Sequence, residues 1–248
     1  MISQSDKPAL FMTGTDTGVG KTTVTAALTL ALQKKGQWVG VMKPVETGIN
    51  PQRQEHSDTD RLRSLLSPPP PFGSICLYAF PQPLAPLACA RKAGTTIDLS
   101  RILSYFHEIT QPYSFVFVEG AGGVFTPITP THTMRDLMST LNLPALVVGR
   151  TTLGSVNHLL LTLEALHGAG IKTCGIVLND PIFITSTDST SQQHTSTIEL
   201  IRELSTVPVF GPLGFHETVR THWRKGVEIL TEHPEIQRLA DHLIEMVP

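Results

Sequence analysis

A lysine and a threonine after a glycine-rich turn are the residues with the plainest chemical use. They end the segment GTDTGVGKT, residues 14–22, which follows an apolar run and leads into an alanine- and leucine-rich helical pattern. Backbone N–H groups of such a turn and the start of the following helix attract an anion. We expect Lys21 to reach the outer phosphates of a nucleotide and the Thr22 hydroxyl to bind Mg²⁺. The segment therefore predicts a phosphate loop.

The spacing of this loop departs from the common pattern. Five residues separate Gly14 from Gly20, whereas the usual phosphate loop has four between its glycines. A glycine-rich turn that carries a surface lysine is the simpler alternative. The strand-like run before the loop and the helical pattern after it favour a nucleotide site.

Polar residues also follow three other apolar runs. Lys43 comes after residues 38–42 and precedes a proline, which cannot continue a central strand. Glu119 ends SFVFV and is followed by GAGG, and Asn179 comes directly after residues 173–178. Parallel sheets bring such strand ends to one edge. There Glu119 could bind Mg²⁺ or orient water, and Lys43 could stabilise charge on a transferring phosphoryl group.

Each of these residues also has a structural alternative. Glu119 could be a solvated carboxylate at a strand end, and Lys43 a solvated lysine. Asp58, in SDTDR, could cap a helix. Asn179 could bind a purine edge through its amide or form a turn within Asn-Asp-Pro. Their common position at one sheet edge favours a shared site.

The elements that position these residues alternate between strand and helix. Short apolar runs predict strands at 9–13, 38–42, 114–118, 145–148, 173–178 and 207–210. Helical patterns and caps predict helices at 21–35, from 57 or 58, 87–92, 98–108, after 134, from about 155, 196–204 and 234–245. This alternation predicts one α/β domain, residues 1–248, with a three-layer P-loop NTPase-like fold and a mostly parallel sheet.

Three segments interrupt this regular alternation. The proline-rich residues 68–86 are either a linker or an ordered excursion, and similar composition on both sides favours an excursion within the domain. Residues 181–197, rich in Ser and Thr, are expected to form a mobile surface loop. Residues 211–218 are also expected to be a loop.

Composition excludes several classes of partner. The chain of 248 residues has a net charge of −2 and no basic stripe, so we expect no nucleic-acid partner. Its apolar runs are too short to span a bilayer. The N-terminus MISQSDKP has neither a basic nor an apolar signal region, and three cysteines without CxxC spacing favour reduced thiols. We therefore expect a cytoplasmic protein without membrane association.

Taken together, the motifs resemble those of the dethiobiotin synthase family. The resemblance covers residues 9–216 in family order, and its five-residue glycine spacing is that family's own form of the loop. The matching segments are GTDTGVGKT (14–22), KPVETG (43–48), SDTDRL (57–62), VEGAGG (118–123), TLGSVNH (152–158) and VLND (177–180).

The resemblance implies a reaction of 7,8-diaminononanoate with CO₂, or bicarbonate as its source, with ATP as co-substrate and Mg²⁺. One amine is carbamylated, and the carbamate oxygen attacks the γ-phosphate. The second amine then attacks the resulting carbamic–phosphoric anhydride, which closes the ureido ring and releases phosphate. Positioning and charge neutralisation are the protein's main tasks in such chemistry.

The resemblance also implies a role for each matched residue. Lys21, Lys43 and Thr17 are the expected catalytic residues, and Lys43 also neutralises the carbamate. Mg²⁺ is expected at Thr22, Asp58 and Glu119. The expected nucleotide contacts are Gly18, Val19, Gly20, Lys21, Thr22, Thr23, Asp58, Glu119, Gly120, Ala121, Gly122, Asn179, Asp180, Gly214, Phe215 and His216. The expected diamine contacts are Thr17, Lys43, Thr47, Leu153, Gly154, Ser155 and Asn157.

The resemblance further implies a homodimer. The helix that opens at Gly154 is expected to present its backbone N–H groups to the substrate carboxylate of the neighbouring subunit. Thr47 takes the place of a serine found in some members and keeps the hydroxyl group.

Three other functions fit the sequence less well. P-loop partitioning or targeting ATPases carry an extra lysine early in the loop, where this chain has Thr13-Gly14-Thr15. A glutamine-using synthetase would need a nucleophilic cysteine, and none here has that context. A nucleotide-binding module without catalysis leaves Lys43 and Thr47 without purpose. The sequence therefore favours an ATP-dependent enzyme.

Overall fold

A parallel sheet forms the centre of the molecule. The computed structural model describes residues 8–50, 57–71, 73–180 and 188–246. The sheet has six strands in the order β2-β5-β1-β6-β7-β8, and each neighbouring pair is parallel. The strands are β1 (Ala9–Gly14), β2 (Val39–Met42), β5 (Phe115–Glu119), β6 (Ala145–Gly149), β7 (Thr173–Leu178) and β8 (Val209–Phe210). This order confirms the predicted α/β fold with a mostly parallel sheet.

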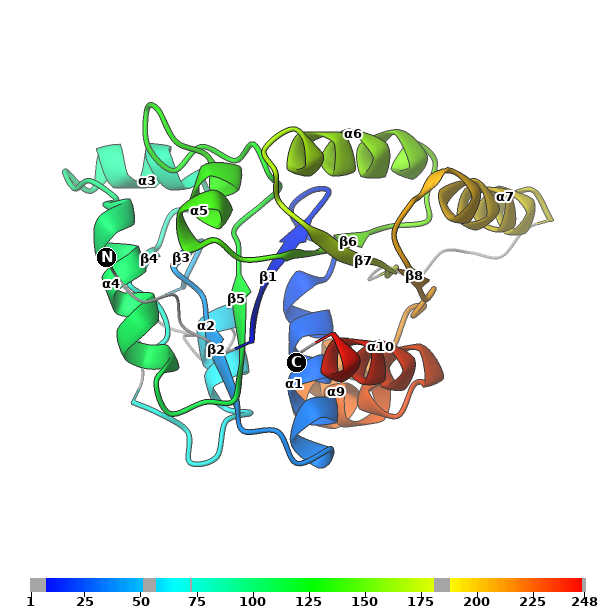
Figure 1. Ribbon diagram of the computed structural model, residues 1–248, viewed down its shortest axis with the longest axis horizontal. Helices are drawn as coiled ribbons and strands as arrows, with labels where there is room; N and C mark the ends of the chain where they lie inside the picture. The colour runs from blue at the N-terminus through cyan, green and yellow to red at the C-terminus, as the bar shows by residue number, and fades with distance from the viewer. Residues whose placement is uncertain (1–7, 51–56, 72, 181–187, 247–248) are drawn as a thin grey trace.

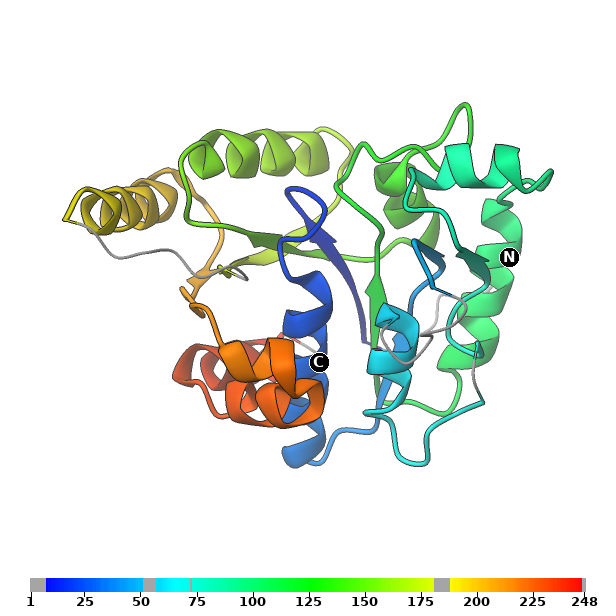
Figure 2. The same ribbon diagram turned by 180° about the vertical axis from the view of Figure 1, so that it is seen from behind.

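Helices cover both faces of the sheet (Figures 1 and 2). One face carries α1 (Lys21–Lys34), α2 (Asp58–Arg63), α9 (Trp223–Thr231) and α10 (Pro234–Glu245). The other face carries α3 (Pro86–Lys92), α4 (Leu99–Thr110), α5 (Met134–Leu141), α6 (Ser155–His167) and α7 (Asp188–Leu204). A short helix, α8 (Glu217–Thr221), precedes α9. Among the described residues, no helix is long and apolar enough to cross a membrane.

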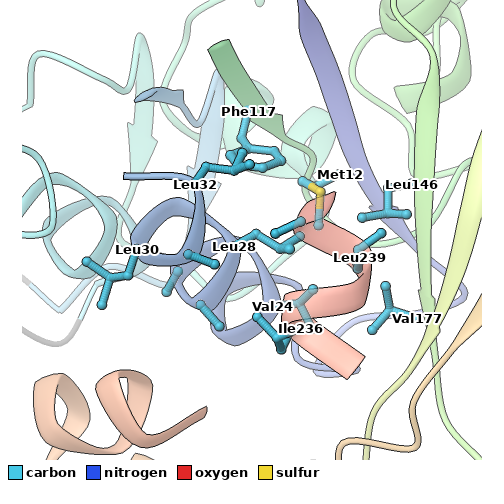
Figure 3. Close-up of a cluster of buried hydrophobic side chains, with 14 of the residues drawn as sticks. Met12, Val24, Leu28, Leu30, Leu32, Phe117, Leu146, Val177, Ile236 and Leu239 are labelled. Carbon is cyan, nitrogen blue, oxygen red and sulfur yellow. The ribbon is translucent and has the colours of Figure 1, made fainter. Parts of the chain in front are cut away.

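Alternating strand residues supply the two halves of the core, because successive side chains of a strand point to opposite faces. On the α1 face they pack against Leu28 and Leu239 (Figure 3). The strand residues on that face include Met12, Phe117, Leu146 and Val177. Those on the other face include Phe11, Val116, Val147 and Ile176. Burial on both faces explains why the strands are continuous apolar runs.

Helices near the sheet edge start at capping side chains or at a glycine with a positive φ. The Ser57 hydroxyl accepts a hydrogen bond from the Asp60 N–H, so Ser57 is the N-cap of α2. Asp98 caps α4 as predicted, accepting from the N–H groups of Ser100 and Arg101. Gly20, with φ of 93°, precedes α1 in a conformation that favours glycine.

Two predicted loops are partly helical. Residues 188–197 belong to α7, so the prediction of a loop over 181–197 was wrong for this part, and residues 181–187 lie outside the described residues. The Ser- and Thr-rich start of α7 lacks apolar periodicity, but Ile198 and Ile201 further along contact the core. The predicted loop at 211–218 likewise ends earlier, because α8 begins at Glu217.

The chain between β2 and β5 contains regular structure in its described part. β3 (Val45–Thr47) and β4 (Tyr78–Phe80) form a second, two-stranded parallel sheet. Val45, Tyr78 and Phe80 bury their side chains in the core. This pairing agrees with an excursion within the domain. Neither strand was predicted, since each has only three residues.

Candidate functional site

The phosphate loop is held from outside by two side chains. Asn179 Nδ2 donates to the Val19 carbonyl at 2.9 Å. Arg150 Nη2 donates to the carbonyls of Gly18 at 3.1 Å and Thr17 at 3.3 Å. These bonds engage loop carbonyls, which leaves the loop N–H groups available to face an anion. The loop is therefore anchored before any ligand binds.

Lys43 lies between two carboxylates, Asp58 at the start of α2 and Glu119 at the end of β5. Its ammonium lies 2.7 Å from Asp58 Oδ2 and 2.6 Å from Glu119 Oε1. The Thr22 hydroxyl donates to the same Glu119 oxygen at 2.7 Å. Lys43 is 3% exposed and Glu119 is 0% exposed, so this is a buried charge network. The structure thus brings four predicted residues from separate elements into direct contact.

Burial and neighbouring charges shift the pKa values of this network. Burial alone lowers the pKa of Lys43, but the carboxylates of Asp58 and Glu119 outweigh it and raise that pKa. Burial alone raises the pKa of Asp58, but Lys43 outweighs it and lowers that pKa. Burial, with a further contribution from Lys43, lowers the pKa of Lys21 to about 8. Lys43 is therefore a fixed cation, whereas Lys21 is a more easily deprotonated one.

Glu46 holds Asp58 in place through the backbone. Its carboxylate accepts from the Asp58 N–H at 2.7 Å and from the Thr59 N–H at 2.9 Å, and also from the Thr59 hydroxyl. Glu46 is 5% exposed. Three donors satisfy a buried carboxylate that has no cation bonded to it among the described residues. The first turn of α2, which carries Asp58, is therefore fixed to β3.

The residues predicted to bind Mg²⁺ have suitable chemistry for it. Glu119 Oε2 is buried and has no hydrogen-bond partner in the described part of the chain. Together with Asp58 and the Thr22 hydroxyl it offers oxygen ligands, which Mg²⁺ prefers alongside water and substrate phosphates. No cluster of three or more His, Cys, Asp or Glu suited to a metal occurs among the described residues. The two-carboxylate set therefore fits a metal shared with a nucleotide.

A cleft of about 640 Å³ opens beside these residues. Its walls come from the phosphate loop, α2, the segment before α3, the turn after β5 and the start of α9. The lining residues are Thr17, Gly18, Gly20, Lys21, Thr22, Thr23, Lys43, Glu46, Thr47, Asp58, Arg61, Pro83, Leu84, Ala85, Pro86, Gly120, Ala121, Gly122, Thr126, Pro127 and Trp223. Most of the predicted phosphate contacts, two of the three predicted Mg²⁺ ligands and three of the seven predicted diamine contacts thus line one cleft.

Other predicted contacts lie outside this cleft. Asn179 and Asp180 are buried, and Asp180 accepts from the Thr151 N–H at 3.0 Å and the Thr151 hydroxyl at 2.6 Å. His216 bonds the Leu213 carbonyl through Nε2 at 3.1 Å. At the start of α6, Leu153, Gly154 and Asn157 are exposed, with Leu153 at 84%, but Ser155 is buried. The base contacts and the contacts at 153–157 remain predictions.

Sequence reasoning missed four residues that the structure places at the site. They are Glu46, Arg61, Arg150 and Trp223. Glu46 lies inside KPVETG, and Arg61 follows Asp58 by three positions, which puts both on one helix face. Those two could have been found from spacing. Arg150 and Trp223 carry no local signal, because tertiary packing brings them to the site.

The chain is similar to several known proteins. A family model described as an AAA domain matches residues 8–222. An ATP-dependent dethiobiotin synthetase BioD of Anaeromyxobacter dehalogenans is 38% identical over 234 residues, 94% of this chain and 94% of that protein. One of Bacillus cereus is 37% identical over 233 residues, 94% of this chain and 93% of that protein. The MinC:MinD cell division protein complex of Aquifex aeolicus has a TM-score of 0.60 and 16% identity, covering 97% of this chain and 95% of that chain.

The loop, the parallel sheet and the AAA-domain match define a P-loop nucleotide-binding protein. Within that class, the chain belongs to the family of ATP-dependent dethiobiotin synthetases, which are enzymes. This membership confirms the family resemblance of the motifs. The likeness to the cell division protein shows the fold alone, because the identity is low.

Proposed function

We propose that this chain, acting as one domain, converts 7,8-diaminononanoate, CO₂ and ATP into dethiobiotin, ADP and phosphate. The observation that carries the proposal is the Lys43 ammonium between Asp58 and Glu119 beside the phosphate loop. A buried cation fixed at this point can stabilise charge that develops during phosphoryl transfer. Membership of the dethiobiotin synthetase family supports the choice of substrate.

The first chemical step in the proposal joins CO₂ to one amine of the substrate. Thr17 and Thr47 line the cleft next to Lys43 and supply hydroxyl groups for the polar head of the diamine. Lys43 neutralises the carbamate that forms, which keeps its oxygen close to the nucleotide. The residues position the two reactants so that attack becomes an intramolecular step.

The second step moves the γ-phosphoryl group to the carbamate oxygen. Lys21 and Lys43 flank the group in flight, and their charges favour the transition state over the bound substrate. Thr22, Asp58 and Glu119 would hold Mg²⁺, which supplies positive charge to the phosphate oxygens. The second amine then attacks the carbonyl carbon of the carbamic–phosphoric anhydride, the C–O bond to phosphate breaks, and the ureido ring closes.

A second copy of the chain completes the substrate site in this proposal. At the start of α6, Leu153, Gly154 and Asn157 are exposed in one chain, whereas Ser155 is buried. Its helix N-terminus favours an anion, which suits the carboxylate of a diamine bound by the neighbouring subunit. An exposed Leu153 is then covered by the partner.

The experiment is a reconstituted reaction with product analysis. Purified protein receives the diamine, bicarbonate, Mg²⁺ and ATP, and mass spectrometry detects dethiobiotin. Bicarbonate labelled with heavy oxygen should place label in the released phosphate, because the carbamate oxygen leaves with the phosphoryl group. Phosphate without label, formed together with dethiobiotin, would refute the anhydride route. Absence of dethiobiotin in the full mixture would refute the function.

A further inference from the structure

We propose that Arg61, which lies over the Trp223 ring, binds the phosphate chain of the nucleotide from the α2 side of the cleft. Arg61 lies within the matching segment SDTDRL, but the resemblance assigns it no role. This contact deepens the proposed function, since it rests on the proposed use of a nucleoside triphosphate in this cleft.

The geometry of the pair is well defined. Arg61 Cζ lies 4.6 Å from the centroid of the Trp223 ring. Both residues line the cleft that also holds Lys21 and Thr22. A cation over an indole face is attracted by the ring, and the flat guanidinium keeps a fixed orientation there. Trp223 therefore holds the Arg61 guanidinium at the wall of the cleft.

The polar groups of the pair lack partners. In the described part of the chain, the Arg61 guanidinium has no hydrogen bond or ion pair. Trp223 Nε1 is buried, and no acceptor for it is found among the same residues. The neighbouring Arg63, by contrast, donates to Asp60 Oδ1 at 2.7 Å and to the Pro70 carbonyl at 2.9 Å. Buried donors in proteins nearly always have acceptors, so the Trp223 N–H indicates a missing acceptor. The half-buried Arg61 guanidinium over the same ring is open to an anionic ligand.

The charge balance of the cleft also favours a phosphate at Arg61. Lys43 already bonds two carboxylates, and the Lys21 ammonium donates to the Asp16 carbonyl at 2.9 Å. Arg61 is the remaining cation among the described residues that line the cleft. Its charge helps to lower the pKa of Asp58, but it forms no ion pair in the described part of the chain. A guanidinium edge matches two phosphate oxygens, an arrangement that strengthens the contact.

The position of Arg61 and Trp223 in the fold indicates which part of the nucleotide they would contact. Both α2 and α9 pack against α1, and the phosphate loop leads directly into α1. Arg61 and Trp223 line the same cleft as Thr22 and Thr23 in the first turn of α1. A nucleotide whose outer phosphates lie at Lys21 brings its phosphate chain past this point.

Tryptophan fluorescence provides a direct readout. The chain has two tryptophans, so Trp38→Phe leaves Trp223 as the single reporter. Trp38 lies against Tyr113 and lines a different groove. In the absence of diamine, ATP and ADP should change the Trp223 emission, whereas adenosine should have a much smaller effect. Equal responses to adenosine and ADP would overturn the assignment to phosphate.

Calorimetry on arginine variants measures the contact itself. Arg61→Met should weaken ATP and ADP binding by about tenfold or more, as expected for a lost charged hydrogen bond. Arg61→Lys should recover part of the affinity, since it keeps the charge but loses the planar edge. Arg101→Met is the matched control, because Arg101 Cζ lies 5.9 Å from the centroid of the Tyr78 ring, outside the cleft. The Arg101→Met variant should bind ATP like the wild type.

The outcomes separate this proposal from the proposed function. Arg61→Met with an ATP affinity within twofold of wild type would overturn the proposal even in an enzyme that makes dethiobiotin. A higher KM for the diamine with unchanged ATP binding would assign Arg61 to the substrate carboxylate and would also overturn it. Arg61-dependent ATP binding in a protein that makes no dethiobiotin would keep the contact and refute the function.

Discussion

Replacing Lys43 by methionine tests how the protein keeps two carboxylates together. The substitution preserves most of the side-chain volume but removes the ammonium 2.6 Å from Glu119 and 2.7 Å from Asp58. At these distances each attraction is worth about 6 kcal/mol at an effective dielectric constant of about 20, and desolvation offsets much of it. Since Glu119 is 0% exposed, an unpaired buried charge remains.

The expected loss follows from that burial. Breaking a buried pair by removing one partner costs about 3–5 kcal/mol, which in a domain of this size lowers Tm by roughly 6–20 °C. The decrease in Tm should be largest in a buffer that contains a metal chelator. Mg²⁺ should stabilise Lys43→Met more than it stabilises wild type, because the ion replaces the missing positive charge.

Thermal unfolding followed by circular dichroism measures both effects. The double variant Lys43→Met/Glu119→Gln should recover part of the lost Tm, since the unpaired charge is gone. A Tm for Lys43→Met equal to that of wild type in chelator would refute the account of the charge network. An increase in Tm on addition of Mg²⁺ that is the same for Lys43→Met and wild type would also refute it.

Turnover gives an independent view of the same residue. Lys43→Ala should lower kcat by about 100-fold or more, in line with the loss of one preorganised group that stabilises the transition state. Its affinity for ATP should change far less, because Lys43 acts on charge that develops during transfer. A variant whose main defect is weak ATP binding would contradict this role.

Three further predictions concern other parts of the site and the fold. Glu46→Gln should lower stability by about 1–3 kcal/mol in thermal unfolding and also lower kcat, because an N–H group of the turn that carries Asp58 loses its acceptor. Gly20→Ala should weaken ATP binding in calorimetry, since its Cβ would lie 2.1 Å from Asn179 Nδ2. The free energy of unfolding should fall as pH drops below about 6.5, because burial lowers the pKa of His233; His233→Asn, which keeps a cap, should reduce that pH dependence.

Matched variants control each of these. Glu228→Gln removes a carboxylate whose side chain is 51% exposed and should leave Tm within about 1 °C. Gly36→Ala strains a similar positive φ but meets no atom within 4 Å, so it should leave ATP affinity unchanged. The sign for His233 follows from its proton balance: below pH 6.5 the unfolded chain binds the proton that the folded ring resists. Equal slopes for wild type and His233→Asn would refute that contribution.

The parts of the fold with strong local patterns were predictable. Continuous apolar runs located the main strands, and Ser57 and Asp98 marked helix starts by their capping chemistry. Strand ends carrying polar residues indicated the edge of the sheet where Lys43 and Glu119 meet. These features depend on short stretches of sequence, so they were visible without tertiary information.

The parts that depend on distant contacts were not predictable. The start of α7 has no apolar periodicity, so its helical state shows only once the helix is docked on the core. Trp223 reaches Arg61 through the packing of α9 on α1. The bonds of Glu46 to the first turn of α2 required knowledge of where that helix lies relative to β3. In each case long-range packing decided the outcome.

The most direct test of the account is the coupling of phosphate release to product formation. Dethiobiotin and phosphate are measured in the same samples, with the diamine present or omitted. The account predicts equal amounts of both products in the complete mixture and almost no phosphate without the diamine. Phosphate release at an undiminished rate without the diamine, and without dethiobiotin in the complete mixture, would contradict it and favour a switch ATPase on the same fold.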